Sequence, residues 1–104
     1  MKELAQYIKI LGDANRLSII KAIGDDSRSV TEIINLTSLS QTLVSFHLRN
    51  LRDTGIVSTR KEGPFIFYSI SNTSLLDTLD ELSLIAGMKY NSFASKQMTG
   101  QGGL

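Results

Sequence analysis

Residues 29–70 combine two short helical patterns and a strand-like pattern in a fixed order, which restricts the chain to few folds. The first helix is predicted from Ser29, because its S-x-x-E spacing with Glu32 is that of a capping box. Ser40 is a suitable N-cap for a second helix over residues 41–54, and a glycine follows that helix. The sequence therefore predicts two short helices joined by a tight polar turn.

After Gly55 the pattern changes to that of a β-hairpin. The apolar residues 56–57 begin one strand, and the β-prone run Phe65–Ile70 forms the other. The polar segment Arg60–Pro64 lies between them, so we expect a long charged tip rather than a two-residue turn. Residues 58–69 are thus predicted to project from the domain as a hairpin.

Further helices flank this unit on both sides. Apolar residues recur at helical spacing in residues 4–11, and Asp13 is a suitable N-cap for a second helix that ends at Gly24. Residues 25–28 are expected to form a polar loop, and leucines at helical spacing predict a last helix from about Ser74. The expected fold class is α+β, mostly α, with about five helices and a two-stranded hairpin.

Length and composition favour one small domain. We expect residues 1–98 to form it and the glycine-rich residues 99–104 to be a flexible tail. The formal net charge is only +1, but residues 40–70 hold four basic and two acidic side chains. The sequence has no cysteine, and its first residues resemble neither a signal peptide nor a membrane span. A cytoplasmic protein without membrane association is expected.

The helix over residues 41–54 has an apolar stripe on one side and polar residues on the other. Short polar groups near the N-terminus of such a helix are typical of a helix that reads base edges in the major groove. Gln41 suits a paired contact to adenine, and Arg49 suits guanine or a phosphate. The outward polar residues are Gln41, Thr42, Ser45 and Arg49, and Arg60 and Lys61 of the hairpin are expected to contact the flanking DNA.

Other interpretations stay open. A polar helix face and a charged hairpin are also ordinary on a protein surface, and the leucine-rich last helix suits a protein–protein interaction module. An enzyme is not expected, because no acid–base pair or activated nucleophile stands out and the only histidine, His47, lies in the helix predicted over residues 41–54. Neither a catalytic residue nor a cofactor is expected.

Three separated segments resemble the ArsR-type winged helix-turn-helix repressors. They read LGDANRLSII from residue 11, LSQTLVSFHLRNLRDTGIV from residue 39, and RKEG at residue 60 with FYSI at residue 67. The resemblance covers about residues 4–88. The positions that match the family's pattern are Asp13, Arg16, Leu17, Ser40, Gln41, Ser45, His47 and Leu48.

The resemblance implies a homodimeric transcriptional repressor that binds an inverted-repeat operator in double-stranded DNA. Helix 41–54 would lie in the major groove and wing 58–69 on the flanking DNA. The implied DNA-contacting residues are Ser40, Gln41, Thr42, Ser45, Phe46, His47, Arg49, Arg60 and Lys61. The first and last helices would join the dimer through Leu4, Tyr7, Ile8, Leu75, Leu79, Leu82, Ile85 and Ala86.

The chain departs from the metal-sensing members of this family. Those members use cysteines in the third helix or Asp and His ligands on the last helix, whereas residues 27–32 here read SRSVTE and the last helix has no histidine. Asp77, Asp80 and Glu81 are expected to be solvated charges, so no metal site is expected. The signal is left open between an unidentified small-molecule effector, a protein partner and the protein's own concentration.

Four further positions differ from the family pattern or need a separate interpretation. Ser38 replaces the usual glycine of the turn, which predicts a costlier turn. Phe46 replaces a polar residue and either contacts a thymine methyl or packs inward. His47 is expected to be structural or to contact a phosphate rather than to sense a signal, and Pro64 is expected to stiffen the wing tip.

Overall fold

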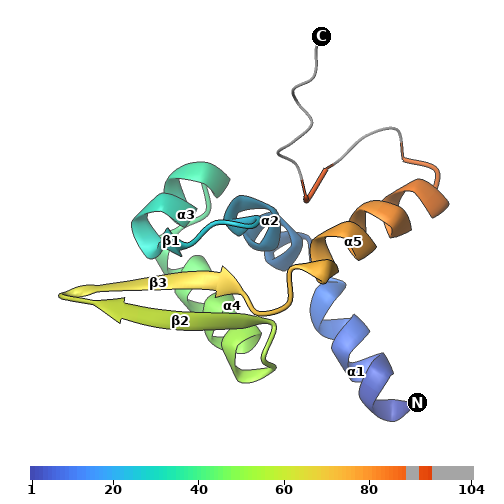
Figure 1. The fold of residues 1–104 in the computed structure, drawn as a ribbon, viewed down its shortest axis with the longest axis horizontal. Coiled ribbons are helices and arrows are strands. Elements are labelled where there is room, and N and C mark those ends of the chain that lie inside the picture. Colours follow the sequence, from blue (N-terminus) through green and yellow to red (C-terminus); the bar gives the residue numbers. More distant parts are fainter. Residues whose placement is uncertain (89–91, 95–104) are drawn as a thin grey trace, which may run out of the picture.

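The computed structural model describes residues 1–88 and 92–94, so the expected tail at 99–104 lies outside the described residues. That part of the chain contains five helices and three strands (Figure 1). In chain order they are α1 (Lys2–Leu11), α2 (Ala14–Ile23), β1 (Arg28–Ser29), α3 (Val30–Thr37), α4 (Gln41–Asp53), β2 (Val57–Glu62), β3 (Phe65–Ile70) and α5 (Ser74–Ile85). The predicted α+β fold, mostly helical with a hairpin wing, is confirmed.

Three helices begin at the residues that the sequence predicts as N-caps. The carboxylate of Asp13 accepts hydrogen bonds from two backbone amides in the first turn of α2, at 2.9 and 3.0 Å. Ser29 and Glu32 form the predicted capping box at the start of α3. The hydroxyl of Ser40 accepts a hydrogen bond from an amide of α4 at 3.1 Å. Each cap satisfies amides that the first helical turn leaves without a partner, and this fixes where the helix starts.

The core forms where the apolar stripe of α4 packs against α2 and α3. Three isoleucines of α2 are fully buried there, and the hairpin and α5 close the remaining sides. Each such side chain contributes about 1.5–3 kcal/mol through its removal from water. The buried apolar residues are Ile19, Ile20, Ile23, Ile33, Val44, Leu48, Leu51, Ile56, Val57, Ile70, Leu76, Leu79 and Phe93.

The three strands form one antiparallel sheet in the order β1–β3–β2. β1 pairs with β3, so that Arg28 lies opposite Tyr68. The expectation of a loop over residues 25–28 was therefore wrong at its last residue. A strand of two residues is too short to show an alternation of apolar and polar side chains. β1 is a strand only because it pairs with β3.

The wing ends in the two-residue turn Gly63–Pro64, so the prediction of a long charged tip was also wrong. β2 and β3 pair as far as Glu62 opposite Phe65, which places Arg60 and Lys61 within a strand. Gly63 has a φ of 59°, and the following proline ring fixes φ near about −65°, the combination found in a type II′ turn. The sequence pattern does not predict this pairing, because the exposed, charged strand β2 lacks the alternation of apolar and polar residues that marks a strand.

Ser38 forms the turn between α3 and α4 in the left-handed conformation, with φ of 62° and ψ of 15°. Residues with a Cβ adopt this conformation at a cost of about 1–2 kcal/mol, and glycine does not carry that cost. The prediction that serine makes this turn costlier than glycine agrees with the observed backbone. The turn sets the angle at which α4 leaves α3.

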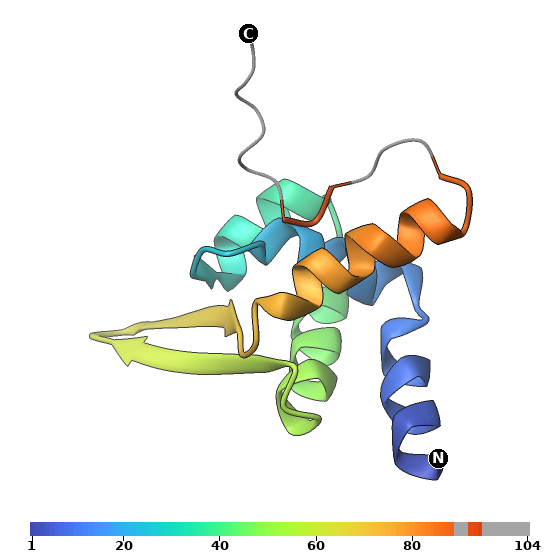
Figure 2. The same cartoon turned by 45° about the vertical axis from the view of Figure 1, so that its right-hand side comes forward.

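The helices α1 and α5 lie at the end of the molecule opposite the wing tip (Figures 1 and 2). α1 has no buried residue and contacts the rest of the domain chiefly through α2. A ten-residue helix is marginal on its own in water, so α1 gains from a further surface to pack against. In the described residues, no helix has both the length and the apolar character required to span a bilayer.

Asp80 on α5 binds the segment that follows the helix. Its carboxylate accepts hydrogen bonds from the backbone amides of Phe93 and Ala94, at 2.6 and 3.1 Å. The expectation that Asp77, Asp80 and Glu81 are all solvated is therefore wrong for Asp80, while the other two are exposed. These hydrogen bonds place Phe93 in the core, a long-range contact without a local sequence signal.

Asp13 gives a prediction about stability and pH. The Arg16 backbone amide that donates to the Asp13 carboxylate holds the pKa of this group below its ordinary value. A group whose pKa is lower in the folded state stabilises the fold above its unfolded pKa, and the effect is lost as pH falls through the folded pKa. We expect Asp13→Ala to cost about 1 kcal/mol near neutral pH, measured by urea unfolding.

Asp13→Asn is the matched control, since the amide oxygen still caps α2 but does not titrate. We expect wild type to lose more stability than Asp13→Asn between about pH 5 and pH 2. Parallel stability curves for the two proteins over this range would contradict the role of the ionised cap.

Candidate nucleic-acid interface

The outward face of α4 carries the polar residues that the sequence predicts there. Gln41, Thr42, Ser45 and Arg49 are all exposed, because the core holds the opposite side of the helix. Among the described residues, no ion pair involves Arg49. One guanidinium and three neutral hydrogen-bonding groups thus lie on a single helical face, an arrangement suited to bonding base edges and phosphates.

Phe46 lies on the same face, four residues after Thr42 and three before Arg49. Its side chain is 57% exposed, which excludes the alternative that it packs inward. Its ring and the His47 ring are in a T-shaped arrangement, with the centroids 5.3 Å apart. An apolar group therefore lies in the middle of an otherwise polar surface.

His47 lies beneath this face and is only 5% exposed. Its Nδ1 is 3.4 Å from Nη1 of Arg16, and Nε of the same arginine donates to the backbone carbonyl of Ile10. Arg16 thus links the end of α1, the start of α2 and the middle of α4. Of the two roles expected for His47, burial favours the structural one over a phosphate contact.

The two basic residues of the wing lie on opposite faces of the hairpin, because neighbouring residues in a strand alternate. The guanidinium carbon of Arg60 is 5.2 Å from the ring centroid of Phe67, and Arg60 forms an ion pair with Glu62 at 3.5 Å. Lys61 shares its face with Tyr68 and makes no ion pair with a described residue. The charge of Arg60 is therefore partly neutralised, and that of Lys61 is not.

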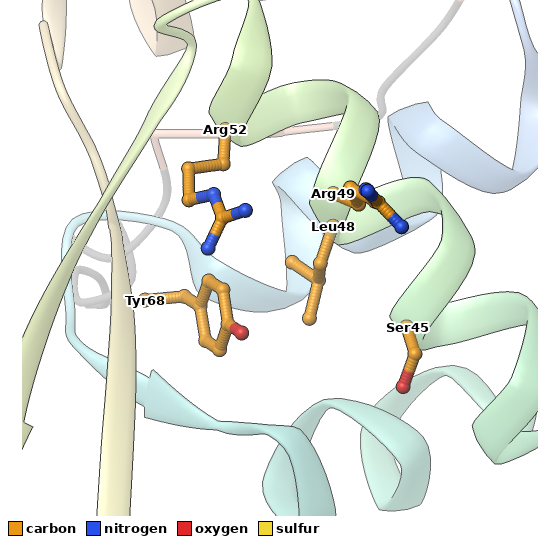
Figure 3. Close-up of a pocket in the computed structure, with 5 residues that line it drawn as sticks. All are labelled: Ser45, Leu48, Arg49, Arg52 and Tyr68. Carbon is orange, nitrogen blue, oxygen red and sulfur yellow. The ribbon is translucent and has the colours of Figure 1, made fainter.

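A notch of about 200 Å³ separates α4 from the wing, lined by Ser45, Leu48, Arg49, Arg52 and Tyr68. We call it the α4–wing notch. Figure 3 shows Arg52 extending from α4 toward Tyr68 on β3, with Leu48 between this pair and the side chains of Arg49 and Ser45. Two guanidinium groups and two hydroxyl groups thus border one apolar floor.

The residues expected to contact DNA include neither Arg52 nor Tyr68, although Arg52 belongs to the basic excess noted in residues 40–70. Arg52 carried a usable signal, because it lies three residues after Arg49 and seven after Ser45, on one side of α4. Tyr68 carried none, since only the pairing of β3 with its neighbours and the packing of the sheet bring its ring beside α4.

Exposed apolar side chains gather on α1 and α5. Leu79 departs from the expected dimer set, because it is only 6% exposed and belongs to the core of its own chain, while Leu75 is half-buried and packs against that core. Leu82 lies three residues after Leu79 and seven after Leu75, so it borders the same side of α5, but it is 56% exposed. The exposed members of the expected set are Leu4, Tyr7, Ile8, Leu82, Ile85 and Ala86.

Candidate metal ligands do not assemble in the described part of the chain. Residues 1–88 and 92–94 contain no group of three or more His, Cys, Asp or Glu side chains able to hold a metal ion. His47 is buried beside a guanidinium, and the carboxylate of Asp80 is occupied by backbone amides.

Comparison with known proteins identifies relatives of this chain. The family model described as "Bacterial regulatory protein, arsR family" matches residues 13–59. The chain is 35% identical to the cadmium resistance transcriptional regulatory protein CadC of Listeria innocua over 71% of this chain, and spans 63% of that relative's length. It is 31% identical to the arsenical resistance operon repressor of Staphylococcus aureus over 81% of each chain.

Solved structures share the fold over most of the chain. NolR from Sinorhizobium fredii is 32% identical, with a TM-score of 0.74 over 85% of this chain and 88% of NolR. A homodimeric winged helix-turn-helix DNA-binding domain from Mycobacterium bovis, described as a possible ArsR-family regulator, is 26% identical. Its TM-score is 0.72 over 83% of this chain and 80% of that domain.

The position of His47 gives a second prediction. Replacing this buried ring by Ala leaves a cavity and removes one of the partners of Arg16, so we expect His47→Ala to lower the free energy of unfolding by about 2 kcal/mol. Arg49→Ala, an exposed neighbour on the same helix, should change it by no more than about 0.5 kcal/mol. Urea unfolding of both variants measures the difference, and equal effects would contradict a structural role for His47.

Proposed function

The chain belongs to the arsR family of bacterial regulatory proteins, and on this premise we propose that it is a homodimeric repressor of an inverted-repeat operator in double-stranded DNA. The observation that carries the proposal is the exposed polar face of α4 beside a projecting basic hairpin. A repressor of this kind acts by occupying DNA that the transcription machinery needs.

We place α4 in the major groove with its N-terminal half against the bases. Gln41 is in the first turn, and Thr42 and Ser45 follow on the exposed face. The Ser40 cap leaves other amides of the first turn to face the DNA, where the positive end of the helix dipole favours a phosphate. Arg49 lies a turn later and suits a guanine or the backbone.

The wing supplies affinity rather than base choice. Because Arg60 contacts Phe67 and Glu62, Lys61 is the basic residue of the wing that is more available to bind the flanking phosphates. Phe46 suits contact with a thymine methyl, because it is the apolar group on the groove-facing side of α4. The contacts of α4 would then select the DNA sequence, and the contacts of the wing would orient the protein on the duplex.

Dimerisation through α1 and α5 follows from the exposed apolar side chains of these helices. Ile8, Leu82 and Ile85 are each more than half exposed in one protomer. Burying them against a second copy would leave both wings at the outer ends of the dimer, because α1 and α5 lie opposite the wing tip (Figure 1). Two α4 helices would then read two half-sites.

We propose that the regulatory signal differs from that of thiolate metal sensors. This sequence has no cysteine, so the soft ligands that favour cadmium or arsenic are absent from it. Control by a small-molecule effector, a partner or protein concentration is compatible with the proposal.

Operator binding is tested by a mobility-shift titration against DNA upstream of the protein's own gene. We expect a specific complex whose affinity falls steeply with salt. Gln41→Ala and Arg49→Ala should each weaken it by about tenfold or more without dissociating the dimer. Absence of a specific complex at low salt, with the dimer intact, would contradict the proposal and favour a protein–protein interaction module.

The dimer surface is tested by light scattering of the purified protein. We expect the double variant Leu82→Glu, Ile85→Glu to be monomeric, because burying two carboxylates without partners opposes association. Leu84→Glu is the matched control: Leu84 is 60% exposed but lies on the other side of α5, so this variant should remain dimeric. A dimer that survives the double substitution would contradict the assignment of this face.

A further inference from the structure

The α4–wing notch has a rigid frame and a charged rim. Its floor, Leu48, is 1% exposed and belongs to the core. Tyr68 is half-buried and packed against that core, and it is paired on both sides within the sheet, with Arg28 and Thr59. The phenol ring therefore has little freedom to move, while its hydroxyl reaches the notch (Figure 3).

The polar groups on this rim have unused hydrogen-bonding capacity. The Arg52 side chain is 53% exposed, and its one ion pair among the described residues is a 3.9 Å contact with the adjacent Asp53. An exposed pair of this length holds a guanidinium only weakly. The Tyr68 hydroxyl makes no hydrogen bond with any described residue. A guanidinium and a phenol hydroxyl are thus available to donate to one acceptor.

A DNA strand that passes the protein supplies such an acceptor in its backbone phosphates. This step rests on the proposed function. A helix in the major groove and a hairpin at the neighbouring minor groove contact opposite sides of one sugar–phosphate strand. That strand must pass between α4 and the wing. The α4–wing notch is the gap between these two elements.

We propose that the α4–wing notch binds one backbone phosphate of the operator strand that crosses between the two grooves, with Arg52 and Tyr68 as its principal donors. Arg49 and Ser45 border the notch on the side of the major groove. Arg52 provides charge-assisted hydrogen bonds, and Tyr68 adds a neutral donor at a fixed position. The contact fixes the distance between helix and wing along the DNA without reading a base.

The two donors predict different salt dependences. Arg52→Gln removes a charge, so we expect about tenfold weaker binding per notch, or about a hundredfold for a dimer with two notches. The slope of log affinity against log salt should fall by about two per dimer. Tyr68→Phe removes only a neutral donor, so it should weaken binding about fivefold per notch and leave the slope unchanged.

Fluorescence anisotropy on the operator and on a shuffled duplex, at four or more salt concentrations, measures these changes. Because a backbone contact carries no sequence information, both variants should weaken binding to the two duplexes by similar factors. Lys9→Gln on α1 controls for a general loss of positive charge and should preserve the wild-type slope. Thermal unfolding and light scattering verify that each variant is folded and dimeric.

Operators with a single neutral methylphosphonate locate the phosphate. We expect one position per half-site where this change weakens wild-type binding about tenfold but has little further effect on Arg52→Gln. If Arg52→Gln and Tyr68→Phe bind like wild type while Arg49→Ala does not, the notch proposal is overturned and the proposed function stands. If wild type binds no operator, the proposed function fails as well.

A free small molecule that carries a phosphate group could occupy the α4–wing notch in place of a DNA phosphate. Titration of the dimer with inorganic phosphate, followed by amide NMR shifts at Arg52 and Tyr68, separates the two sources. Saturable phosphate binding in the notch, combined with DNA affinities that neither substitution changes, would overturn the assignment to DNA.

Discussion

The packing of α4 against the isoleucines of α2 is the constraint on which the rest of the molecule depends. Val44, Leu48 and Leu51 occupy one side of α4 and are almost fully buried. Rotating the helix about its axis would expose this stripe to water and bury polar residues without partners, at several kcal/mol. The orientation of the opposite face is therefore fixed by the core. The base of the hairpin packs in the same core, so the distance between α4 and the wing is fixed as well.

A second set of contacts connects the exposed polar face of α4 to the rest of the domain. Arg16 joins the end of α1 to His47 in the middle of α4, and Asp13 caps the helix that carries Arg16. The side chain of His47 thus belongs to the structural framework beneath the polar face of α4. With a formal net charge of only +1, the protein has little long-range attraction for DNA. For the DNA binding that we propose, affinity would then come from local contacts, repeated in the two subunits of the proposed dimer.

Much of the fold follows from local sequence signals. Asp13, Ser29 and Ser40 mark helix starts because a cap and the amides it satisfies lie within three residues of each other. The polar face of α4 was equally readable, since helical periodicity places residues three and four apart together. The strand β1 and the two-residue wing turn were missed. Both depend on pairing with β3, which local patterns do not reveal.

The sequence by itself determined the order of the helices and of the two hairpin strands, the helix caps and the polar side of α4, because each rests on interactions within a few residues. The tertiary structure decided which of the remaining side chains share a site. It buried His47 and Leu79, used Asp80 to hold Phe93, and set Tyr68 beside Arg52 across a notch. Those outcomes depend on contacts between residues distant along the chain, and packing against the common core selects them.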